Sequence, residues 1–243
     1  MKRVSTLDLN CDLGEGEPSA KTRALMRWVT SANVACGGHA GGVESMQRCV
    51  QSAKRLGVKL GAHPGPCSRG DFGRGPVQIT ADELELLLLH QVGALDRIAR
   101  ANGVRLHHIK LHGALYHMSE ASAELGRRYV KCVARWWPEA IIYASASGSV
   151  SGLAKRSGVQ VWAEAFVDRG YEDTGSLVPR NKPGALLTDS RDVERRVQKI
   201  LDEGVIESVS GRRLALYPQT LCIHSDTPNA PRIAREVRRL LAG

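Results

Sequence analysis

The sequence predicts an α/β protein, a seven-stranded parallel β/α barrel. Seven short apolar segments alternate with helical segments along the 243 residues, which is typical of parallel β/α folds. No linker, repeat or change of composition interrupts them, so we expect one domain over residues 1–243. Polar side chains follow nearly every predicted strand, and a barrel directs all of its strand ends towards one central site.

The predicted strands are short and rich in β-branched or apolar residues, as buried parallel strands are. They are Ser5–Cys11, Ser31–Cys36, Val58–Ala62, His107–Leu111, Ala140–Ala144, Val159–Ala165 and Thr220–Ile223. An open doubly wound sheet fits the same number of strands, but it gathers its ligand site where the strand order reverses. Polar residues at the ends of almost all strands therefore favour the barrel.

Amphipathic helices are expected between these strands. The clearest start is the capping box of Thr80 and Glu83, and the clearest ends are Gly57 and Gly204. The predicted helices are Val43–Gly57, Ala81–Asn102, Ala121–Trp137, Ser149–Arg156, Asp189–Glu203 and Ala230–Leu241. Their apolar residues recur at helical spacing, so one face of each helix is expected to pack against the strands.

The composition excludes several classes of protein. With 42% hydrophobic and 24% charged residues, the chain is neither disordered nor of low complexity. The helical segments lack an apolar run near the roughly 20 residues that a membrane-spanning helix needs. Asp8 interrupts the amino-terminal segment before it can form a secretion signal. We therefore expect a cytoplasmic protein without a membrane partner.

The net charge of +9 does not by itself indicate nucleic-acid binding. The basic residues are spread over helical faces, as in Arg232–Leu241, and only 5% of the residues are aromatic. We expect no nucleic-acid partner, whereas a positive field favours a small anionic substrate. The six cysteines form no C-x-x-C pair, which predicts free thiols with neither a disulfide framework nor a thiolate-bound zinc ion.

Polar residues alternate along the first predicted strand. Asp8, Asn10 and Asp12 are two positions apart and therefore share one face. In a barrel that face is the lumen, where a carboxylate is costly unless it is paired or functional. An exposed edge strand is the alternative. Asn33 and His39, in and after the second strand, flank a Gly-rich turn of the kind that aims backbone N–H groups at anions.

Histidines mark the ends of the third and fourth predicted strands. His63 precedes a Pro-Gly turn and the polar loop 69–75, which fits either a lid or a disordered excursion. Lys110 and His112 lie two positions apart and face the same way. A lumen-facing lysine can clamp an anion, and a histidine beside it can transfer protons. We expect both in the site and neither to be needed for folding.

The last predicted strands add carboxylates, guanidinium groups and a third histidine. These residues are Glu164, Asp168, Arg169 and Arg180 at or after the sixth strand, and His224 and Asp226 after the seventh. Arginine binds carboxylates and phosphates through two parallel hydrogen bonds, so an anionic substrate fits this set. An internal network of ion pairs is the alternative.

Seven segments stand out together, in this order: DLNCDLGE (8–15), SANVACGGHAG (31–41), GAHPG (61–65), HIKLHGALY (108–116), EAFVDRGY (164–171), GSLVPR (175–180) and CIHSDTP (222–228). They span nearly the whole chain. Together they resemble the LamB/YcsF family, whose members are described as the A subunit of 5-oxoprolinase and were formerly called lactam-utilisation proteins.

The resemblance implies a barrel of the glycoside hydrolase/deacetylase type and ATP-dependent opening of 5-oxo-L-proline to L-glutamate. It also implies ATP, taken with Mg²⁺ through a complex with partner subunits B and C, and no tightly bound metal. The sequence contains no phosphate-binding loop of the G-x-x-x-x-G-K-[ST] type. The isolated chain is therefore expected to hydrolyse little ATP.

The expected site residues fall into two groups, and none of them is expected to bind a metal. The expected catalytic residues are Asp12, His63, Lys110, His112, Glu164, Asp168 and His224. The expected substrate-binding residues are Asn10, Asn33, His39, Arg169, Arg180 and Asp226.

Two alternatives to this function stay open. One is a metal-dependent hydrolase of the deacetylase type, in which one Asp and two His from separate strand ends bind a divalent ion. The other is a non-catalytic partner subunit. Departures from the family pattern at Gly42, Leu111, His117 and Ser225 bear on activity, and the acid lost at Gly42 favours the non-catalytic alternative. The sequence determines neither which lactam is opened nor whether the chain forms a homo-oligomer.

Overall fold

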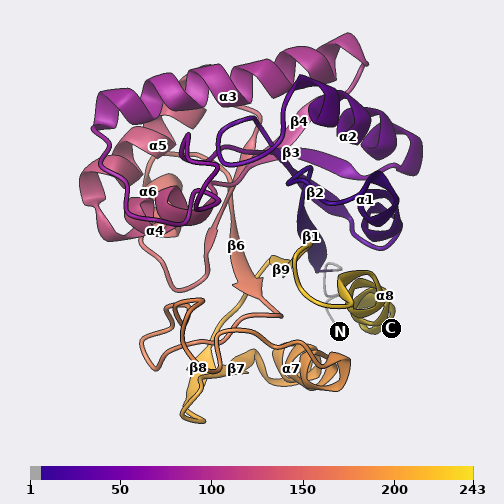
Figure 1. The fold of residues 1–243 in the computed structure, drawn as a ribbon. Coiled ribbons are helices and arrows are strands. Elements are labelled where there is room, and N and C mark those ends of the chain that lie inside the picture. Colours follow the sequence, from indigo (N-terminus) through magenta and orange to yellow (C-terminus); the bar gives the residue numbers. More distant parts are fainter. Residues whose placement is uncertain (1–6, 243) are drawn as a thin grey trace.

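The computed structural model describes residues 7–242 and confirms the predicted barrel. Seven parallel strands close in the order β1-β2-β3-β4-β5-β6-β9 (Figure 1). They are β1 (Asp8–Leu13), β2 (Ser31–Ala35), β3 (Lys59–His63), β4 (Leu106–Ile109), β5 (Ile141–Ser145), β6 (Val161–Phe166) and β9 (Thr220–His224). Ser5 and Thr6, expected to begin the first strand, lie outside the described residues.

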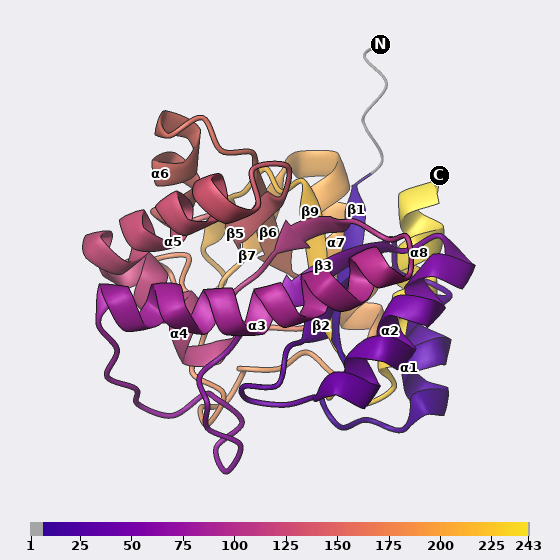
Figure 2. The same ribbon diagram turned by 90° about the horizontal axis from the view of Figure 1, so that it is seen from above.

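Helices surround the barrel as an outer layer. Figures 1 and 2 show α1, α2 and α3 side by side around it, in sequence order. The helices are α1 (Ser19–Met26), α2 (Val43–Leu56), α3 (Ala81–Ala101), α4 (Gly113–Ala121), α5 (Ala123–Trp136), α6 (Val150–Arg156), α7 (Ser190–Glu203) and α8 (Ala230–Ala242). Among residues 7–242, no helix combines the length and apolar character that crossing a membrane requires.

Three parts of the structure differ from the sequence prediction. The expected helix over Ala121–Trp137 is α5, which begins after Ser122, whose hydroxyl accepts the Leu125 N–H at 3.3 Å. The helix before it, α4, was not predicted, since it has no side-chain cap and no acidic first turn. Helix α1 was missed, since it has no side-chain cap and no acidic first turn. The antiparallel pair β7 (Val205–Glu207) and β8 (Arg213–Ala215) was also missed; in Figure 1 it lies with α7, away from α3.

The alternation along β1 separates two kinds of core. Leu9, Cys11 and Leu13 are fully buried in the apolar layer between strands and helices, whereas Asp8, Asn10 and Asp12 are buried in the lumen. The closing pairs place Asp12 opposite His224 of β9 and opposite Asn33 of β2. The strand register therefore brings polar residues from distant parts of the sequence to one level of the barrel.

The floor of the lumen is a network of hydrogen bonds. The Asn33 amide donates to Asn10 Oδ1 and to Asp12 Oδ1, both at 2.7 Å, and His108 Nε2 lies 2.6 Å from Asn33 Oδ1. The His108 ring fits only because residue 61 is glycine, since a Cβ on Gly61 would lie 2.0 Å from it. This floor fixes the carboxylate of Asp12 from below.

Candidate active site

The principal cavity lies at the carboxyl ends of the barrel strands. Its volume is about 510 Å³, within the range of small-molecule sites. It is lined by Asp12, His63, Arg74, Lys110, Leu111, His112, Gly113, Tyr116, His117, Phe166, Arg169, Leu177, Val178, Pro179, Arg180, Asn181 and His224. Seven of the residues that the sequence placed in the site therefore line it: Asp12, His63, Lys110, His112, Arg169, Arg180 and His224.

One buried group, here called the lysine cluster, consists of Lys110, Asp12, Glu164 and Cys222. The Lys110 ammonium lies 2.9 Å from Asp12 Oδ1, 3.0 Å from Glu164 Oε1 and 3.1 Å from Cys222 Sγ. Burial opposes the charge on Lys110, but Asp12, Cys222 and Glu164 outweigh it and raise the pKa of Lys110 well above its usual value. The cluster thus holds an ammonium between two carboxylates.

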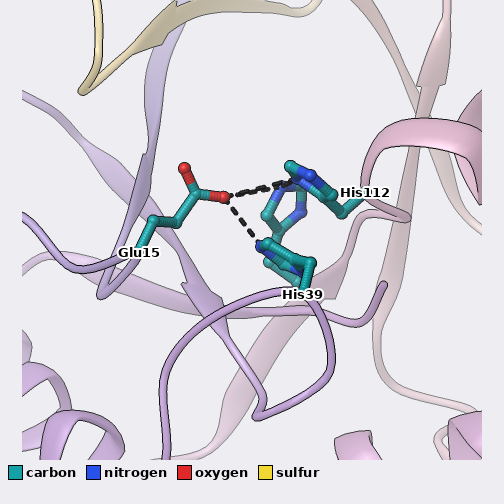
Figure 3. A group of neighbouring side chains, drawn as sticks. Glu15, His39 and His112 are labelled. Carbon is teal, nitrogen blue, oxygen red and sulfur yellow. Dashed lines mark hydrogen bonds and ion pairs between the residues drawn. The ribbon is translucent and has the colours of Figure 1, made fainter. Parts of the chain in front are cut away.

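A second group, here called the histidine cluster, consists of Glu15, His39, His63 and His112. Glu15 Oε1 lies 2.9 Å from His39 Nε2 and 3.3 Å from His112 Nδ1 (Figure 3). It also lies 3.7 Å from His63 Nε2. Burial and then Asp12 raise the pKa of Glu15, while burial and His63 lower the pKa of His112. The ring of His39 stacks on that of His112 with centroids 3.5 Å apart.

Backbone carbonyls fix the tautomers of two of these rings. His63 Nδ1 lies 2.8 Å from the Lys110 carbonyl, and His112 Nε2 lies 2.8 Å from the Phe72 carbonyl. A carbonyl oxygen only accepts hydrogen bonds, so we assign a hydrogen to each of these nitrogens. The opposite nitrogens, His63 Nε2 and His112 Nδ1, face each other at 3.0 Å.

Asp168 orients the third histidine of the cavity. His224 Nδ1 donates to Asp168 Oδ1 at 3.0 Å, and Asp168 Oδ2 accepts from the His224 backbone at 2.8 Å and from the Thr227 hydroxyl at 2.6 Å. Burial would raise the pKa of Asp168, but His224 and Thr227 outweigh it and lower that pKa. His224 is therefore held with Nε2 directed away from Asp168.

Arginines flank the mouth of the cavity. Arg74 and Arg180 lie 2.9 and 3.1 Å from the same oxygen of Asp226, and their side chains are 29% and 23% exposed. Arg74 comes from the polar loop after β3, whose Gly73 carbonyl accepts from the Ala114 N–H at 2.9 Å. A Cβ on Gly113 would lie 2.3 Å from that carbonyl, so the loop is packed tightly on α4 and forms a wall of the site.

Several predicted site residues support the cavity without lining it. The Asn10 amide donates to Glu164 Oε1 at 2.9 Å, and Asn33 holds Asp12 from the floor. His39 contacts Glu15 in the histidine cluster, and Glu164 contacts Lys110 in the lysine cluster. Arg169 reaches the cavity, but its guanidinium donates to the carbonyls of Ala185 and Val178, so it ties the surrounding loop together and is not a free anion clamp.

The sequence prediction missed several residues of the site. Glu15 is the centre of the histidine cluster, and it stands between Gly14 and Gly16, off the two-residue period of β1. Its place directly after the strand was the available signal. Tyr116 donates to Glu164 Oε2 at 3.1 Å, Phe72 orients His112, and Cys222 contacts Lys110. Nothing in their spacing marks these contacts.

Comparison with known proteins now supplies the family. The model of the LamB/YcsF family matches residues 7–243. The chain belongs to the LamB/YcsF family. Two curated relatives, each named as the A subunit of 5-oxoprolinase, are similar over 97% of this chain: that of Nitrobacter winogradskyi is 40% identical over 94% of its length, and that of Pyrococcus abyssi is 38% identical over 93%.

A solved structure supports the same assignment for this LamB/YcsF chain. The crystal structure of the lactam utilization protein from Thermus thermophilus superposes with a TM-score of 0.89 at 36% identity. The match covers 98% of this chain and 96% of that one. The similarity therefore extends over nearly the whole fold.

Proposed function

We propose that this chain is the A subunit of an ATP-dependent 5-oxoprolinase, which opens 5-oxo-L-proline to L-glutamate. The observation that carries the proposal is the similarity to relatives of that name over nearly the whole chain. The cavity agrees with it, because it joins basic groups at the mouth to acid–base groups at the base. A small anionic ring fits this arrangement.

ATP makes the ring opening favourable, since a five-membered lactam is a stable amide. Transfer of the γ-phosphoryl group to the lactam oxygen yields ADP and an activated ring. Water then adds to the ring carbon, the C–N bond breaks to give γ-glutamyl phosphate, and a second water releases phosphate. In this scheme Arg180 and Arg74 bind the anionic groups at the mouth.

The base of the cavity provides groups for the water and for the ring nitrogen. His63 and His112 direct nitrogens without hydrogens into the site, where they can accept a hydrogen bond from water. His224, oriented by Asp168, donates a proton to the leaving nitrogen. The ammonium of Lys110 stabilises negative charge that develops at the ring carbon's oxygen.

ATP and Mg²⁺ are expected to bind to the complex with subunits B and C, because this sequence has no phosphate-binding loop. The six cysteines of the chain are free thiols, and five of them are buried. Free thiols fit a reducing compartment, so we place the reaction in the cytoplasm.

The departures from the family pattern leave the acid–base groups intact. Gly42 precedes α2, and neither it nor Ser225 lines the principal cavity. Leu111 and His117 do line it, so they are positions where the lactam specificity can differ. This placement favours an active subunit over a non-catalytic one.

The test is glutamate release from 5-oxoproline with ATP and Mg²⁺. We expect release when the chain is mixed with its partner subunits B and C, and none when one of the three is left out. The chain alone should hydrolyse ATP far more slowly than about 1 s⁻¹, a common enzyme rate. Equal glutamate release from subunits B and C without this chain would contradict the proposal, as would ordinary ATP turnover by the chain alone.

A further inference from the structure

The histidine cluster contains an electrostatic conflict between two rings. The hydrogens of His63 and His112 are directed to carbonyl oxygens on the outside of the cluster. When both rings are neutral, their inner nitrogens carry lone pairs, and these lone pairs face each other at 3.0 Å. Two acceptors at that distance repel, so a positively charged group is needed between or beside them.

Of the two carboxylates beside these rings, only Asp12 has a lysine or arginine partner among the described residues, and it shares that partner, Lys110, with Glu164. Among residues 7–242, Glu15 forms ion pairs only with histidines, and its side chain is 4% exposed. Asp12 Oδ1 forms an ion pair with Lys110 and accepts a hydrogen bond from Asn33, while Asp12 Oδ2 lies 3.3 Å from His63 Nε2. One proton on the ring pair would supply a single positive charge, whereas two carboxylate oxygens face the pair.

We propose that His63 Nε2, His112 Nδ1 and Glu15 Oε1 bind a divalent transition-metal ion, with Asp12 Oδ2 as the fourth ligand and Zn²⁺ as the best-fitting ion. Imidazole nitrogen and carboxylate oxygen are the ligands that zinc takes in catalytic sites. The double charge balances Glu15 and the free oxygen of Asp12. Each inner lone pair then has a partner.

The spacing of the donor atoms fits this ion. In a tetrahedral site with bonds of about 2.0–2.2 Å, neighbouring donors lie about 3.3 Å apart. His63 Nε2 lies 3.0 Å from His112 Nδ1, 3.3 Å from Asp12 Oδ2 and 3.7 Å from Glu15 Oε1. Glu15 Oε1 lies 3.3 Å from His112 Nδ1. These four of the six donor separations lie on both sides of the tetrahedral value.

The outer hydrogen bonds have the form that metal-binding histidines show. Such a histidine donates its other ring N–H to a carbonyl or carboxylate, which fixes the ring and its tautomer. His63 and His112 both do so, towards Lys110 and Phe72. The Phe72 backbone has a positive φ of 59°, an uncommon conformation for a side chain of this size, and it presents that carbonyl.

His39 is assigned as a positioning residue. Its Nε2 donates to Glu15 at 2.9 Å, and its ring lies parallel to that of His112 within 3°. Parallel rings at 3.5 Å cannot both direct an in-plane lone pair at one ion, so His39 acts by holding Glu15. Its Nδ1 is buried and has no hydrogen-bond partner among the described residues, which fits a ring held by stacking and by one bond.

An ion at this place would activate water in the proposed reaction. Bound Zn²⁺ lowers the pKa of its water to about 7, which makes a nucleophile available at neutral pH. The ion, in place of the two rings, would then hold the attacking water. This role rests on the proposed function, but metal binding itself does not, and it can be measured on the chain without substrate or partner subunits. The sequence had predicted no tightly bound metal, so the measurement decides between the two expectations.

The experiment is equilibrium dialysis of the purified, chelator-treated full chain against Zn²⁺, with metal content read by mass spectrometry. A parallel titration with Co²⁺ reports ligand geometry through its visible absorption. We expect one ion per chain and Co²⁺ bands typical of four or five ligands. His112→Asn and Glu15→Gln should each weaken binding by at least about 100-fold, and His39→Gln by about tenfold.

Matched controls separate this site from unspecific binding and from misfolding. His90→Ala removes an exposed histidine on α3, and Glu139→Gln removes an exposed acid paired with Arg105, so both should bind as the unchanged chain does. Circular dichroism checks that each variant is folded. An unchanged chain that takes up no ion at about 10 µM Zn²⁺, well above the dissociation constants usual for zinc sites, would overturn the proposal. Folded cluster variants that bind like the controls would overturn it too. Lactam opening by a chain without bound metal would overturn the role of the ion in the reaction and leave the proposed function intact.

Discussion

The lysine cluster and the histidine cluster lie next to each other at the same end of the barrel, yet their charges are balanced differently. In the lysine cluster, an ammonium lies within 3.0 Å of two carboxylates, and all three charged groups come from the chain itself. In the histidine cluster, a buried carboxylate meets three imidazole rings and no lysine or arginine among the described residues. Asp12 belongs to one cluster and touches the other.

The lysine cluster therefore contains its own cation, whereas the histidine cluster needs a bound one. A complete ion pair contributes to folding, because removal of one partner leaves a buried charge alone. A set of aligned lone pairs contributes little to folding and is available for binding and chemistry. Substitutions in the two clusters should therefore affect stability and activity in different proportions.

The largest effect is expected from Lys110→Met. Removal of the ammonium leaves Asp12 and Glu164 buried without a cation, which should cost about 3–5 kcal/mol of unfolding free energy. This revises the expectation from sequence that Lys110 is dispensable for folding. Lactam opening by the three-subunit complex should fall by about 10³ or more, as for loss of an electrostatic stabiliser. Urea unfolding and glutamate release measure the two effects.

A second variant tests the cause of that instability. Glu164→Gln in the Lys110→Met background removes one of the two stranded charges, so part of the lost stability should return. Unfolding free energies of Lys110→Met equal to those of the unchanged chain would show that the lysine cluster is not the stabilising one.

His112→Ala should lower activity strongly and stability only a little. Glutamate release should fall by about 10²–10⁴, the usual contribution of a positioned proton-transfer group or ligand. Stability should fall by much less than for Lys110→Met, because the loss of one ring also removes the repulsion between the two facing lone pairs. His90→Ala is the control for removal of an exposed imidazole. Full activity in a folded His112→Ala complex would place the histidine cluster outside the reaction.

Asp168→Asn is expected to have an intermediate effect. The amide cannot stabilise a charged His224 ring as the carboxylate does, so glutamate release should fall by about 10–100-fold. The control is Asp173→Asn, since Asp173 accepts hydrogen bonds from Ser208 and Ser210 away from the cavity. Equal rates for the two variants would mean that His224 needs no orientation by Asp168.

The smallest effect is expected at the mouth. Arg180→Ala removes a partly exposed guanidinium, so KM for 5-oxoproline should rise about five-fold, the equivalent of roughly 1 kcal/mol, with kcat nearly unchanged. Added salt should shrink the difference, because it screens exposed charges. Arg213→Ala, which breaks an exposed ion pair with Glu203, should leave KM as it was. A large fall in kcat for Arg180→Ala would move this residue from binding into the chemical step.

The sequence was sufficient for the barrel because the information is local. Alternation along β1 placed Asp8, Asn10 and Asp12 in the lumen, and each of the seven predicted strands overlaps an observed one. The capping box at Thr80 and the left-handed Gly57 began and ended helices where expected. Elements without such start and stop signals, which are α1, α4 and the β7–β8 pair, were missed.

The site was predicted less completely because much of it is not written in side-chain spacing. The tautomers of His63 and His112 are set by main-chain carbonyls, and any residue type can supply a carbonyl. Glu15 enters the site through the turn of Gly14 and Gly16, which breaks the period that located Asp12. Arg169 has the expected location, but its partners are carbonyls of its own loop.

The packed loop after β3 determines how molecules reach the cavity. Two of its carbonyls form hydrogen bonds to α4 and to His112. Arg69 donates to the Gly41 carbonyl at 2.7 Å, and the Gln91 side chain forms hydrogen bonds to both the N–H and the carbonyl of Gly65. A loop secured at so many points forms a fixed wall of the cavity, and Arg74 and Arg180 line the cavity beside it. In the proposed complex, a subunit that passes an activated ring to this chain would therefore meet a wall that stays in place and does not close over the ring.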